Sequence, residues 1–325
     1  MLEHATRAST PLRLGQTDIC ISRVGVGAWQ WGDRLYWGYG QTYSEADAYA
    51  AYKTSLTSGL TLFDTAEIYG FGKSERLLAY FGSETAKSPG LSSGTSPVIA
   101  TKFFPYPWRW RSSSLLQALR ASLSRLNLDQ VDLYQVHFPR PFRSVETWAH
   151  ALADAVEAGL AKAVGVSNYN REQVMRTQDA LGKRGVILAS NQIAFSLLNR
   201  HHEYAGTLSA CADLGVSIIA YSPLAQGLLT GKYSLRDKPP WQRRLRGGEV
   251  KIRRAASMLS LMRDIGEEHG GKTPAQVALN WAIAKGTVPI PGAKTAAQAS
   301  ENAGAMGWDL ADSQVQKLDE ASDQS

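Results

Sequence analysis

The sequence has little cysteine and lacks any long apolar run. Its 325 residues include two cysteines, Cys20 and Cys211, which lie far apart and belong to no metal-ligand spacing. We therefore expect free thiols, a reducing compartment and no bound metal. No apolar run approaches the roughly 18 residues that a membrane-spanning helix needs, so we expect no membrane segment. The first ten residues contain no apolar signal core. This predicts a cytoplasmic protein, or one of the plastid stroma if a transit peptide has been removed.

Two familiar glycine patterns for nucleotide binding are also missing. No expected strand is followed by G-x-G-x-x-G, the fingerprint of the Rossmann dinucleotide-binding fold. The run Gly72-Lys73-Ser74 resembles the end of a phosphate-binding loop, but that loop needs a glycine at position 67, where this chain has Glu67. Any nucleotide site in this chain must therefore be built in another way.

Charge is interspersed along most of the chain, which has a formal net charge of +6. The exception is the segment 236–254, with six arginines and two lysines against two acidic residues. A solvated loop and a contact for an anionic ligand are both open. A nucleic-acid contact is a third reading, but no nucleic-acid-binding motif accompanies the charge, and we expect no nucleic-acid partner.

Short apolar segments alternate with helical patterns along the chain. The expected strands are 24–29, 60–66, 98–102, 131–136, 163–166, 188–194, 216–221 and 287–290. The expected helices are 44–58, a run that begins at Lys73, 112–126, 145–157, 171–181, 204–214, 255–269 and 274–284. Ser44 and Thr273 are expected to cap the first and last of these helices.

The strands are apolar without strict alternation, as in a parallel sheet that helices cover on both faces. Eight strand–helix units predict a (β/α)8 barrel, which we expect to be a single domain over 1–325. Residues 12–22 indicate an N-terminal hairpin, 1–11 are expected to be flexible, and extra helices are expected near the C-terminus. The alternative fold is a doubly wound open sheet, but its glycine fingerprint is missing.

The stretch 60–75, LTLFDTAEIYGFGKSE, places Asp64 at the end of a buried strand and Tyr69 five residues later. A buried carboxylate and a phenol are costly unless they are paired or used. For this stretch by itself a structural reading stays open, in which Asp64 caps a helix and Tyr69 packs on the rim.

Polar residues stand at the ends of other strands too, where a barrel of this kind gathers its active site. They are Thr101-Lys102, His137, Ser167-Asn168, Asn191-Gln192, Tyr221-Ser222 and Pro291-Gly292-Ala293-Lys294. Each has a structural alternative: Lys102 could reach solvent, His137 could be a satisfied core histidine, and Ser167-Asn168 could cap a helix. A barrel without an active site would not need polar residues at one strand end after another.

The chemistry that fits these side chains is carbonyl reduction. Tyr69 holds a proton at neutral pH, and Lys102 is expected to lower the phenol pKa toward the working range. Asp64 would balance the ammonium charge, and His137 would orient the carbonyl oxygen. The groups that suit a carboxamide, or stacking on a nicotinamide ring, are Ser167, Asn168, Gln192 and Tyr221.

These residues resemble those of the aldo-keto reductase superfamily over nearly the whole chain. The matching segments are GVGAWQWG at 25–32, FDTAEIYGFGKSE at 63–75, ATKF at 100–103, VDLYQVHFP at 131–139, GVSNY at 165–169, NQIAFSLL at 191–198, YSPLAQGLLTGK at 221–232 and IPGAKTAAQASEN at 290–302. The resemblance implies a barrel that binds an extended nicotinamide cofactor. It also implies a catalytic tetrad of Asp64, Tyr69, Lys102 and His137. The pattern GAKxxxQ resembles bacterial and plant-type members, some of which reduce pyridoxal.

The resemblance also implies a cofactor path, in which NADP is expected. The carboxamide and ring would meet Ser167, Asn168, Gln192 and Tyr221. The pyrophosphate would follow Ser222, Pro223, Leu224, Gln226, Gly227 and Lys232. The adenosine phosphate would meet Gly292, Ala293, Lys294 and Thr295, and the ribose and adenine would meet Gln298, Glu301 and Asn302. Many members carry an arginine where this chain has Gln298, which leaves Lys294 as the main candidate cation for a 2′-phosphate. The loop 234–254 could cover the cofactor.

The expected function is an NADPH-dependent reductase of aldehydes or ketones, with a small-molecule carbonyl substrate. The alternative is a nicotinamide-binding regulatory subunit, because potassium-channel β subunits resemble this barrel and retain its tetrad. Aromatic residues indicate a pocket for an apolar or ring-bearing carbonyl, although several could simply pack the rim. The candidates are Trp29, Tyr36, Trp37, Phe103 and Trp108, with Phe104 and Trp110 nearby.

Overall fold

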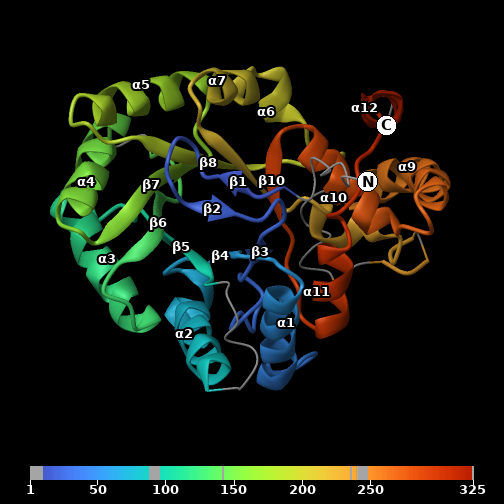
Figure 1. Ribbon diagram of the computed structural model, residues 1–325, viewed down its shortest axis with the longest axis horizontal. Coiled ribbons are helices and arrows are strands. Elements are labelled where there is room, and N and C mark those ends of the chain that lie inside the picture. Colours follow the sequence, from blue (N-terminus) through green and yellow to red (C-terminus); the bar gives the residue numbers. More distant parts are fainter. Residues whose placement is uncertain are drawn as a thin grey trace, which may run out of the picture.

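The structure is a computed structural model that describes residues 10–87, 96–140, 143–234, 236–238, 240 and 248–323. Its centre is an eight-stranded parallel sheet in which the strands lie in the order of the sequence (Figure 1). The strands are β3 (Val26–Gly27), β4 (Leu62–Asp64), β5 (Val98–Phe103), β6 (Val131–Val136), β7 (Ala161–Ser167), β8 (Leu188–Ala194), β9 (Ser217–Tyr221) and β10 (Thr287–Ile290).

Hydrogen bonds between the first and the last strand close this sheet into a barrel. The Gly25 amide donates to the Pro289 carbonyl over 2.9 Å, and the Gly27 amide donates to the Pro291 carbonyl over 3.0 Å. A Cβ on Gly27 would lie 2.9 Å from the Ile290 carbonyl oxygen, so the seam needs glycine there. The predicted (β/α)8 barrel is confirmed, and the open-sheet alternative is wrong.

Helices surround the barrel (Figure 1). They are α1 (Glu45–Thr57), α2 (Lys73–Ala86), α3 (Ser113–Leu126), α4 (Val145–Glu157), α5 (Arg171–Gly182), α6 (His201–Tyr204), α7 (Thr207–Asp213), α9 (Gly248–Glu268), α10 (Pro274–Ala284), α11 (Ala296–Ala303) and α12 (Asp312–Asp323), with 3-10 turns η1 (Tyr69–Gly72) and η2 (Ala225–Thr230). Ser44 and Thr273 cap α1 and α10 through capping boxes, as predicted.

Two helix boundaries differ from the prediction. The expected helix 204–214 is two helices, α6 and α7, because Gly206 adopts a left-handed φ of 71° between them. Helix α9 begins at Gly248 rather than at 255, so the end of the basic segment is helical. The predicted flexible start, 1–11, falls mostly on 1–9, and much of the predicted covering loop, 234–254, falls on 241–247; these two ranges lie outside the described residues.

The N-terminal hairpin, β1 (Leu12–Arg13) and β2 (Cys20–Ile21), lies across one end of the barrel (Figure 1). Its Leu14 and Ile21 are buried with an inner core to which the barrel strands contribute Leu62, Ala100, Leu133, Ala163, Ala189, Ile219, Val288 and Ile290. Gly15 adopts φ 59°, and a Cβ there would lie 2.6 Å from the Ala189 carbonyl oxygen. The hairpin therefore closes the N-terminal end of the barrel and leaves the C-terminal strand ends for a site.

Candidate active site

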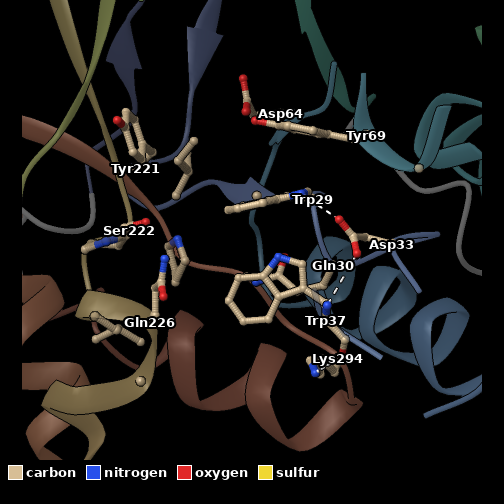
Figure 2. Close-up of a pocket in the computed structure, with 18 of the residues that line it drawn as sticks. Trp29, Gln30, Asp33, Trp37, Asp64, Tyr69, Tyr221, Ser222, Gln226 and Lys294 are labelled. Atoms are coloured by element: carbon tan, nitrogen blue, oxygen red, sulfur yellow. Dashed lines mark hydrogen bonds between the residues drawn. The ribbon is translucent and has the colours of Figure 1, made fainter. Parts of the chain in front are cut away.

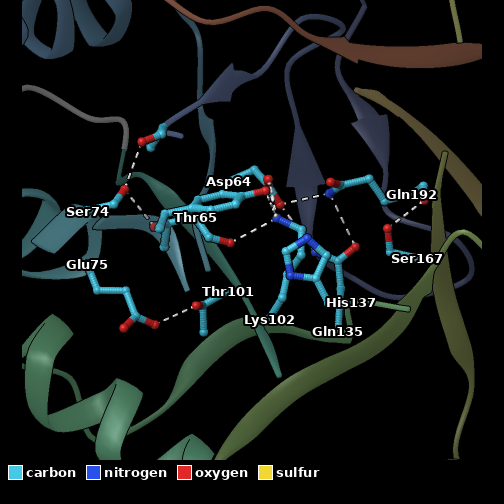
Figure 3. A network of polar contacts seen from close by, with 12 residues as sticks. Asp64, Thr65, Ser74, Glu75, Thr101, Lys102, Gln135, His137, Ser167 and Gln192 are labelled. Atoms are coloured by element: carbon cyan, nitrogen blue, oxygen red, sulfur yellow. Dashed lines mark hydrogen bonds and ion pairs between the residues drawn. The ribbon is translucent and has the colours of Figure 1, made fainter. Parts of the chain in front are cut away.

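The four residues predicted as a tetrad come together at the C-terminal ends of the strands. Asp64 ends β4, Lys102 lies in β5, and His137 follows β6. Tyr69 begins η1, the turn after β4. The Lys102 Nζ lies 2.5 Å from Asp64 Oδ2 and 3.5 Å from the Tyr69 hydroxyl oxygen (Figure 3). The tertiary structure thus joins an ion pair to a phenol.

The ion pair is fully buried, and its hydrogen bonds are satisfied. Lys102 also donates to the Thr65 carbonyl over 2.9 Å. Asp64 Oδ1 accepts from Gln192 Nε2 at 2.8 Å and from Gln135 Nε2 at 3.3 Å. Removal of one partner from such a pair would leave an uncompensated buried charge. Lys102 therefore does not extend to solvent, and this structural alternative is excluded.

The phenol of Tyr69 sits between two aromatic rings. Its ring stacks on Trp29 at 5.9 Å and meets the His137 ring edge-on at 5.7 Å. Burial raises the pKa of the Tyr69 phenol well above its usual value, and the nearby Asp64 carboxylate adds to the rise. The predicted fall of this pKa toward the working range is not found, because burial disfavours the phenolate. Tyr69 therefore keeps its proton at neutral pH.

His137 is buried beside the phenol and stays neutral. Burial lowers the pKa of its imidazole well below the usual value, and the Lys102 charge lowers it further. Among the described residues its Nδ1 is buried without a hydrogen-bond partner. His137 is therefore not a core histidine with all its hydrogen bonds satisfied, because Nδ1 has no partner among the described residues. An orphaned polar atom in a cavity wall is a candidate ligand contact.

A second buried carboxylate, that of Glu75, is linked to the strand that carries Lys102. Glu75 in α2 is fully buried and accepts a hydrogen bond from the Thr101 hydroxyl at 2.6 Å (Figure 3). It also pairs with Arg125 Nε at 2.5 Å. Thr101 precedes Lys102 in β5, so this network links α2 and α3 to the strand that carries the lysine. It holds the register of β5 against the outer helices.

Polar residues after β7 and in β8 form the next part of the site. The Asn168 amide donates to the His137 carbonyl at 3.1 Å and to Ser167 Oγ at 3.0 Å, and its oxygen accepts from the Tyr221 hydroxyl at 2.9 Å. Asn168 adopts φ 63°, a conformation that asparagine tolerates. Ser167 donates to the Gln192 carbonyl at 2.8 Å. The fixed amide of Asn168 places the Tyr221 ring at the cavity wall.

The loop after β9 has an unusual backbone. Positive φ angles occur at Ser222 (52°), Ala225 (46°), Gln226 (58°) and Gly227 (96°). Left-handed residues in a turn point successive backbone N–H groups to one side and form concave anion sites. Strain of this kind is concentrated at functional sites. The loop therefore suits a phosphate group.

All these elements border one cavity of about 830 Å³. Asp64, Tyr69 and His137 line one part of it, and Lys102 lies behind them. Figure 2 shows Tyr221 and Ser222 on one side and Trp29, Asp33 and Trp37 on the other. The predicted cofactor residues that line the cavity are Ser167, Asn168, Gln192, Tyr221, Ser222, Pro223, Leu224, Gln226, Gly227, Lys232, Gly292, Lys294, Gln298, Glu301 and Asn302.

Two predicted cofactor residues do not line this cavity. Ala293 is buried, and its carbonyl accepts a hydrogen bond from the Trp31 indole at 2.8 Å. Thr295 caps α11 through the Gln298 amide. Through these contacts the two residues hold the segment that carries Gly292, Lys294 and Gln298, which do line the cavity.

The structure brings only part of the predicted aromatic set to the cavity. Trp29 and Trp37 line it, whereas Tyr36 does not line it but stacks on Trp29 at 5.1 Å. Phe103 does not line it, because side chains alternate along β5 and its ring packs outward on Trp148 of α4 at 4.9 Å. Phe104 lines the cavity instead. Trp108 stacks on Tyr106 with 70% of its surface exposed and does not line it either.

Sequence reasoning missed several side chains in the cavity wall. Asp33 accepts from the Trp29 indole at 2.9 Å and from the Tyr36 amide at 2.8 Å, so it orders the loop after β3. Gln30 faces Gly292, where an added Cβ would lie 1.7 Å from the Gln30 amide nitrogen. Leu35, Phe71 and Phe138 are further members of the wall. The matching segments contain Gln30, Phe71 and Phe138, but none of them contains Asp33 or Leu35.

The described residues contain no group of three or more His, Cys, Asp or Glu side chains arranged to hold a metal ion. In the same ranges, no helix has both the length and the apolar composition to span a bilayer. Cys20 is exposed, Cys211 is buried, and both are free thiols.

Comparisons with known proteins agree with this geometry. The profile of the Aldo/keto reductase family matches residues 23–323. The chain is 40% identical over 315 residues to the chloroplastic pyridoxal reductase of Arabidopsis thaliana, with 94% of this chain and 85% of that protein covered. It is 31% identical over 305 residues to a 6-dehydroglucose reductase of Novosphingobium aromaticivorans, with 90% and 89% covered.

The fold also matches solved structures. A glycerol dehydrogenase from Gluconobacter oxydans superposes with a TM-score of 0.82 and 25% sequence identity, and the match covers 97% of this chain and 95% of that one. These proteins are named for different substrates. The barrel and the profile match over residues 23–323 show that this chain belongs to the aldo/keto reductase family of oxidoreductases.

Proposed function

We propose that the chain is an NADPH-dependent reductase that converts an aldehyde or a ketone to an alcohol. The observation that carries this proposal is the Lys102 ammonium, which lies 2.5 Å from the buried Asp64 carboxylate and 3.5 Å from the Tyr69 hydroxyl, two groups that line the cavity. When bound, a nicotinamide cofactor would supply a hydride to the carbonyl carbon. The protein must then deliver a proton to the carbonyl oxygen.

Tyr69 is the proposed proton donor. Its raised pKa keeps the proton on the hydroxyl until negative charge develops on the carbonyl oxygen. The phenolate that remains after transfer would lie beside the Lys102 ammonium, which stabilises it. Asp64 positions the ammonium, and neutral His137 orients the carbonyl oxygen from the edge of the Tyr69 ring. Acid catalysis of this kind contributes about 10² to 10⁴-fold to a rate.

The residues present fit a nicotinamide dinucleotide. Tyr221 offers a ring face at the cavity wall, and the left-handed backbone after β9 offers N–H groups for the pyrophosphate. Gln30 Oε1 is buried without a hydrogen-bond partner within the described ranges, and its residue lines the cavity beside Gly292. It is an acceptor that a ligand hydroxyl would satisfy. Lys294 is the cation that would meet a 2′-phosphate at the start of α11.

A carbonyl panel tests the proposal. Purified protein is mixed with NADPH and with aldehydes such as 4-nitrobenzaldehyde, and the loss of NADPH absorbance is followed while the alcohol is identified by mass spectrometry. We expect steady turnover and one alcohol formed per NADPH consumed. Tight NADPH binding without turnover of any carbonyl would contradict the enzyme proposal and favour a nicotinamide-binding regulatory subunit.

A further inference from the structure

The turn that begins with Tyr69 contains an unusual phenylalanine. Gly70, Phe71 and Gly72 adopt successive positive φ angles of 54°, 54° and 80°. Glycine adopts this conformation freely, but a residue with a Cβ is destabilised by about 1–2 kcal/mol there. Phe71 is the middle residue of the three, so a bulky aromatic side chain occupies a position that favours glycine or asparagine.

Neighbouring elements impose this backbone conformation. A Cβ on Gly70 would lie 2.6 Å from the Gly32 carbonyl oxygen, and a Cβ on Gly72 would lie 2.6 Å from Arg125 Cδ. The turn is therefore packed between the loop after β3 and helix α3. The same packing fixes Tyr69 at the start of the turn and Phe71 two residues later. Strain held in this way at a site indicates a functional constraint on the side chain.

The side chain of Phe71 is also exposed. Phe71 has 86% of its surface exposed and Leu35 has 82%, the largest exposed fractions among the large hydrophobic residues of the described chain. Both residues line the cavity that contains Tyr69. Leu35 belongs to the loop that contacts the turn at Gly32 and Gly70. Two exposed apolar side chains on adjoining loops at a cavity rim are unfavourable in water, unless a ligand covers them.

We propose that Phe71 and Leu35 are specificity residues that contact the non-reacting part of an apolar or ring-bearing carbonyl substrate. This inference rests on the proposed function, in which Tyr69 protonates the carbonyl oxygen. The carbonyl must then lie at Tyr69, and the remainder of the substrate extends along the turn toward Phe71. The substrate class is a carbonyl compound with a ring or a chain of several carbons beyond the carbonyl group, in preference to a small aldehyde.

A matched pair of substrates tests this inference. Propanal and 3-phenylpropanal share the same reacting group and differ only in the phenyl ring. The variant Phe71→Asn removes the ring while asparagine tolerates the left-handed backbone, so the turn should be kept. We expect KM for 3-phenylpropanal to rise about 2- to 10-fold, the range that one aromatic contact gives. KM for propanal and the Kd of NADPH should change by less than about 2-fold, because neither involves that contact.

Two further variants complete the test. Phe71→Met keeps an apolar surface and should restore most of the affinity for 3-phenylpropanal. Tyr80→Ala removes an aromatic residue of α2 that is 48% exposed and does not line the cavity, and it should leave both KM values unchanged. Leu35→Ser should act in the same direction as Phe71→Asn.

The outcomes separate this inference from the proposed function. A wild-type protein that reduces both aldehydes, with a ratio of KM values that Phe71→Asn does not alter, would overturn the specificity role alone. Equal losses for both aldehydes would show that Phe71 acts through the position of Tyr69, which also contradicts the inference. A wild-type protein that reduces no carbonyl would overturn the proposed function and this inference together.

Discussion

The Nζ of Lys294 donates a hydrogen bond to the backbone carbonyl oxygen of Trp37, 2.5 Å away. The ammonium also lies over the rings of Trp37 and Tyr43, at 5.4 Å and 4.5 Å from their centroids. Lys294 therefore ties the segment before α11 to the loop after β3, two segments that border the same cavity (Figure 2). A phosphate at this position would compete with the Trp37 carbonyl for the ammonium group.

Lys294→Ala should remove most of the preference for NADPH. We expect the wild-type protein to bind NADPH at least about 10-fold more tightly than NADH, because a charge-assisted contact contributes about 1.5–3 kcal/mol. The Kd of NADPH should rise in the variant while the Kd of NADH hardly changes, as measured by fluorescence titration. Lys294→Arg keeps the charge and should retain the preference.

The hydrogen bond from Lys294 to Trp37 suggests an alternative role for the lysine, which the same experiment tests. If Lys294 serves mainly to hold the loop, Lys294→Ala should weaken NADPH and NADH equally and should lower the melting temperature. The 2′-phosphate would then be bound elsewhere, and arginines of the segment 236–254 are the next candidates.

Tyr69→Phe should abolish most turnover without loss of cofactor binding. The phenol is the proposed proton donor, so its removal should lower kcat by about 100-fold or more. The Kd of NADPH should stay near the wild-type value. Tyr106→Phe, a matched change outside the cavity wall, should leave kcat unchanged. A Tyr69→Phe variant with wild-type kcat would remove Tyr69 from the mechanism.

The Asp64–Lys102 pair should show strong coupling in stability but not in activity. Lys102→Met should abolish turnover, and Asp64→Asn should lower it less severely, because Asp64 acts through the ammonium. Either single change breaks a buried pair and should lower the free energy of unfolding by about 3–5 kcal/mol. The double variant has no unpaired buried charge, so it should regain stability while it remains inactive.

Chemical denaturation and single-turnover kinetics on the three variants measure these effects. The comparison of the two single variants with the double variant isolates the ion pair. Gln192 and Gln135, which also contact Asp64, are unchanged in all three. If Asp64→Asn behaves like a surface substitution in both measurements, the charge-pair role is wrong.

His137 should make the stability of the fold depend on pH below neutrality. Its pKa is depressed in the folded state by burial and by Lys102, so the unfolded chain binds a proton at higher pH than the folded one. As pH falls below the unfolded value of about 6.5, the free energy of unfolding should decrease by up to about 1.4 kcal/mol per pH unit. Denaturant titrations at steps of about 0.5 pH unit, from about pH 7.5 to about pH 5, measure this slope.

The control for that slope is His137→Gln, which removes the titrating ring. Its slope between the same pH values should be smaller than that of the wild-type protein by the contribution of one proton. Identical slopes in wild type and His137→Gln would mean that the imidazole is not held neutral by the fold.

Much of the fold, and the clustering of Asp64, Tyr69, Lys102 and His137, could be predicted from the sequence. Regular alternation of apolar strands with helices predicts a parallel sheet with helices on both faces. Eight such units, without the glycine fingerprint of the open sheet, favoured the barrel. Asp64, Lys102 and His137 were found because they are polar residues at the ends of apolar runs. The position of Phe103 was also within reach: it follows Lys102, and consecutive side chains of a strand point to opposite sides.

Contacts between distant segments decided the rest. The pKa of Tyr69 rises because strands and loops bury it, and no local pattern states how much water reaches a phenol. The left-handed turn that contains Phe71 is packed by close approaches of Gly70 to Gly32 and of Gly72 to Arg125, which belong to other elements of the barrel. Lys294 reaches Trp37 across 257 positions of sequence. Local sequence sets which side chain each position carries, but burial, strain and partner choice are properties of the packed chain, since each depends on atoms that only the closed barrel brings together.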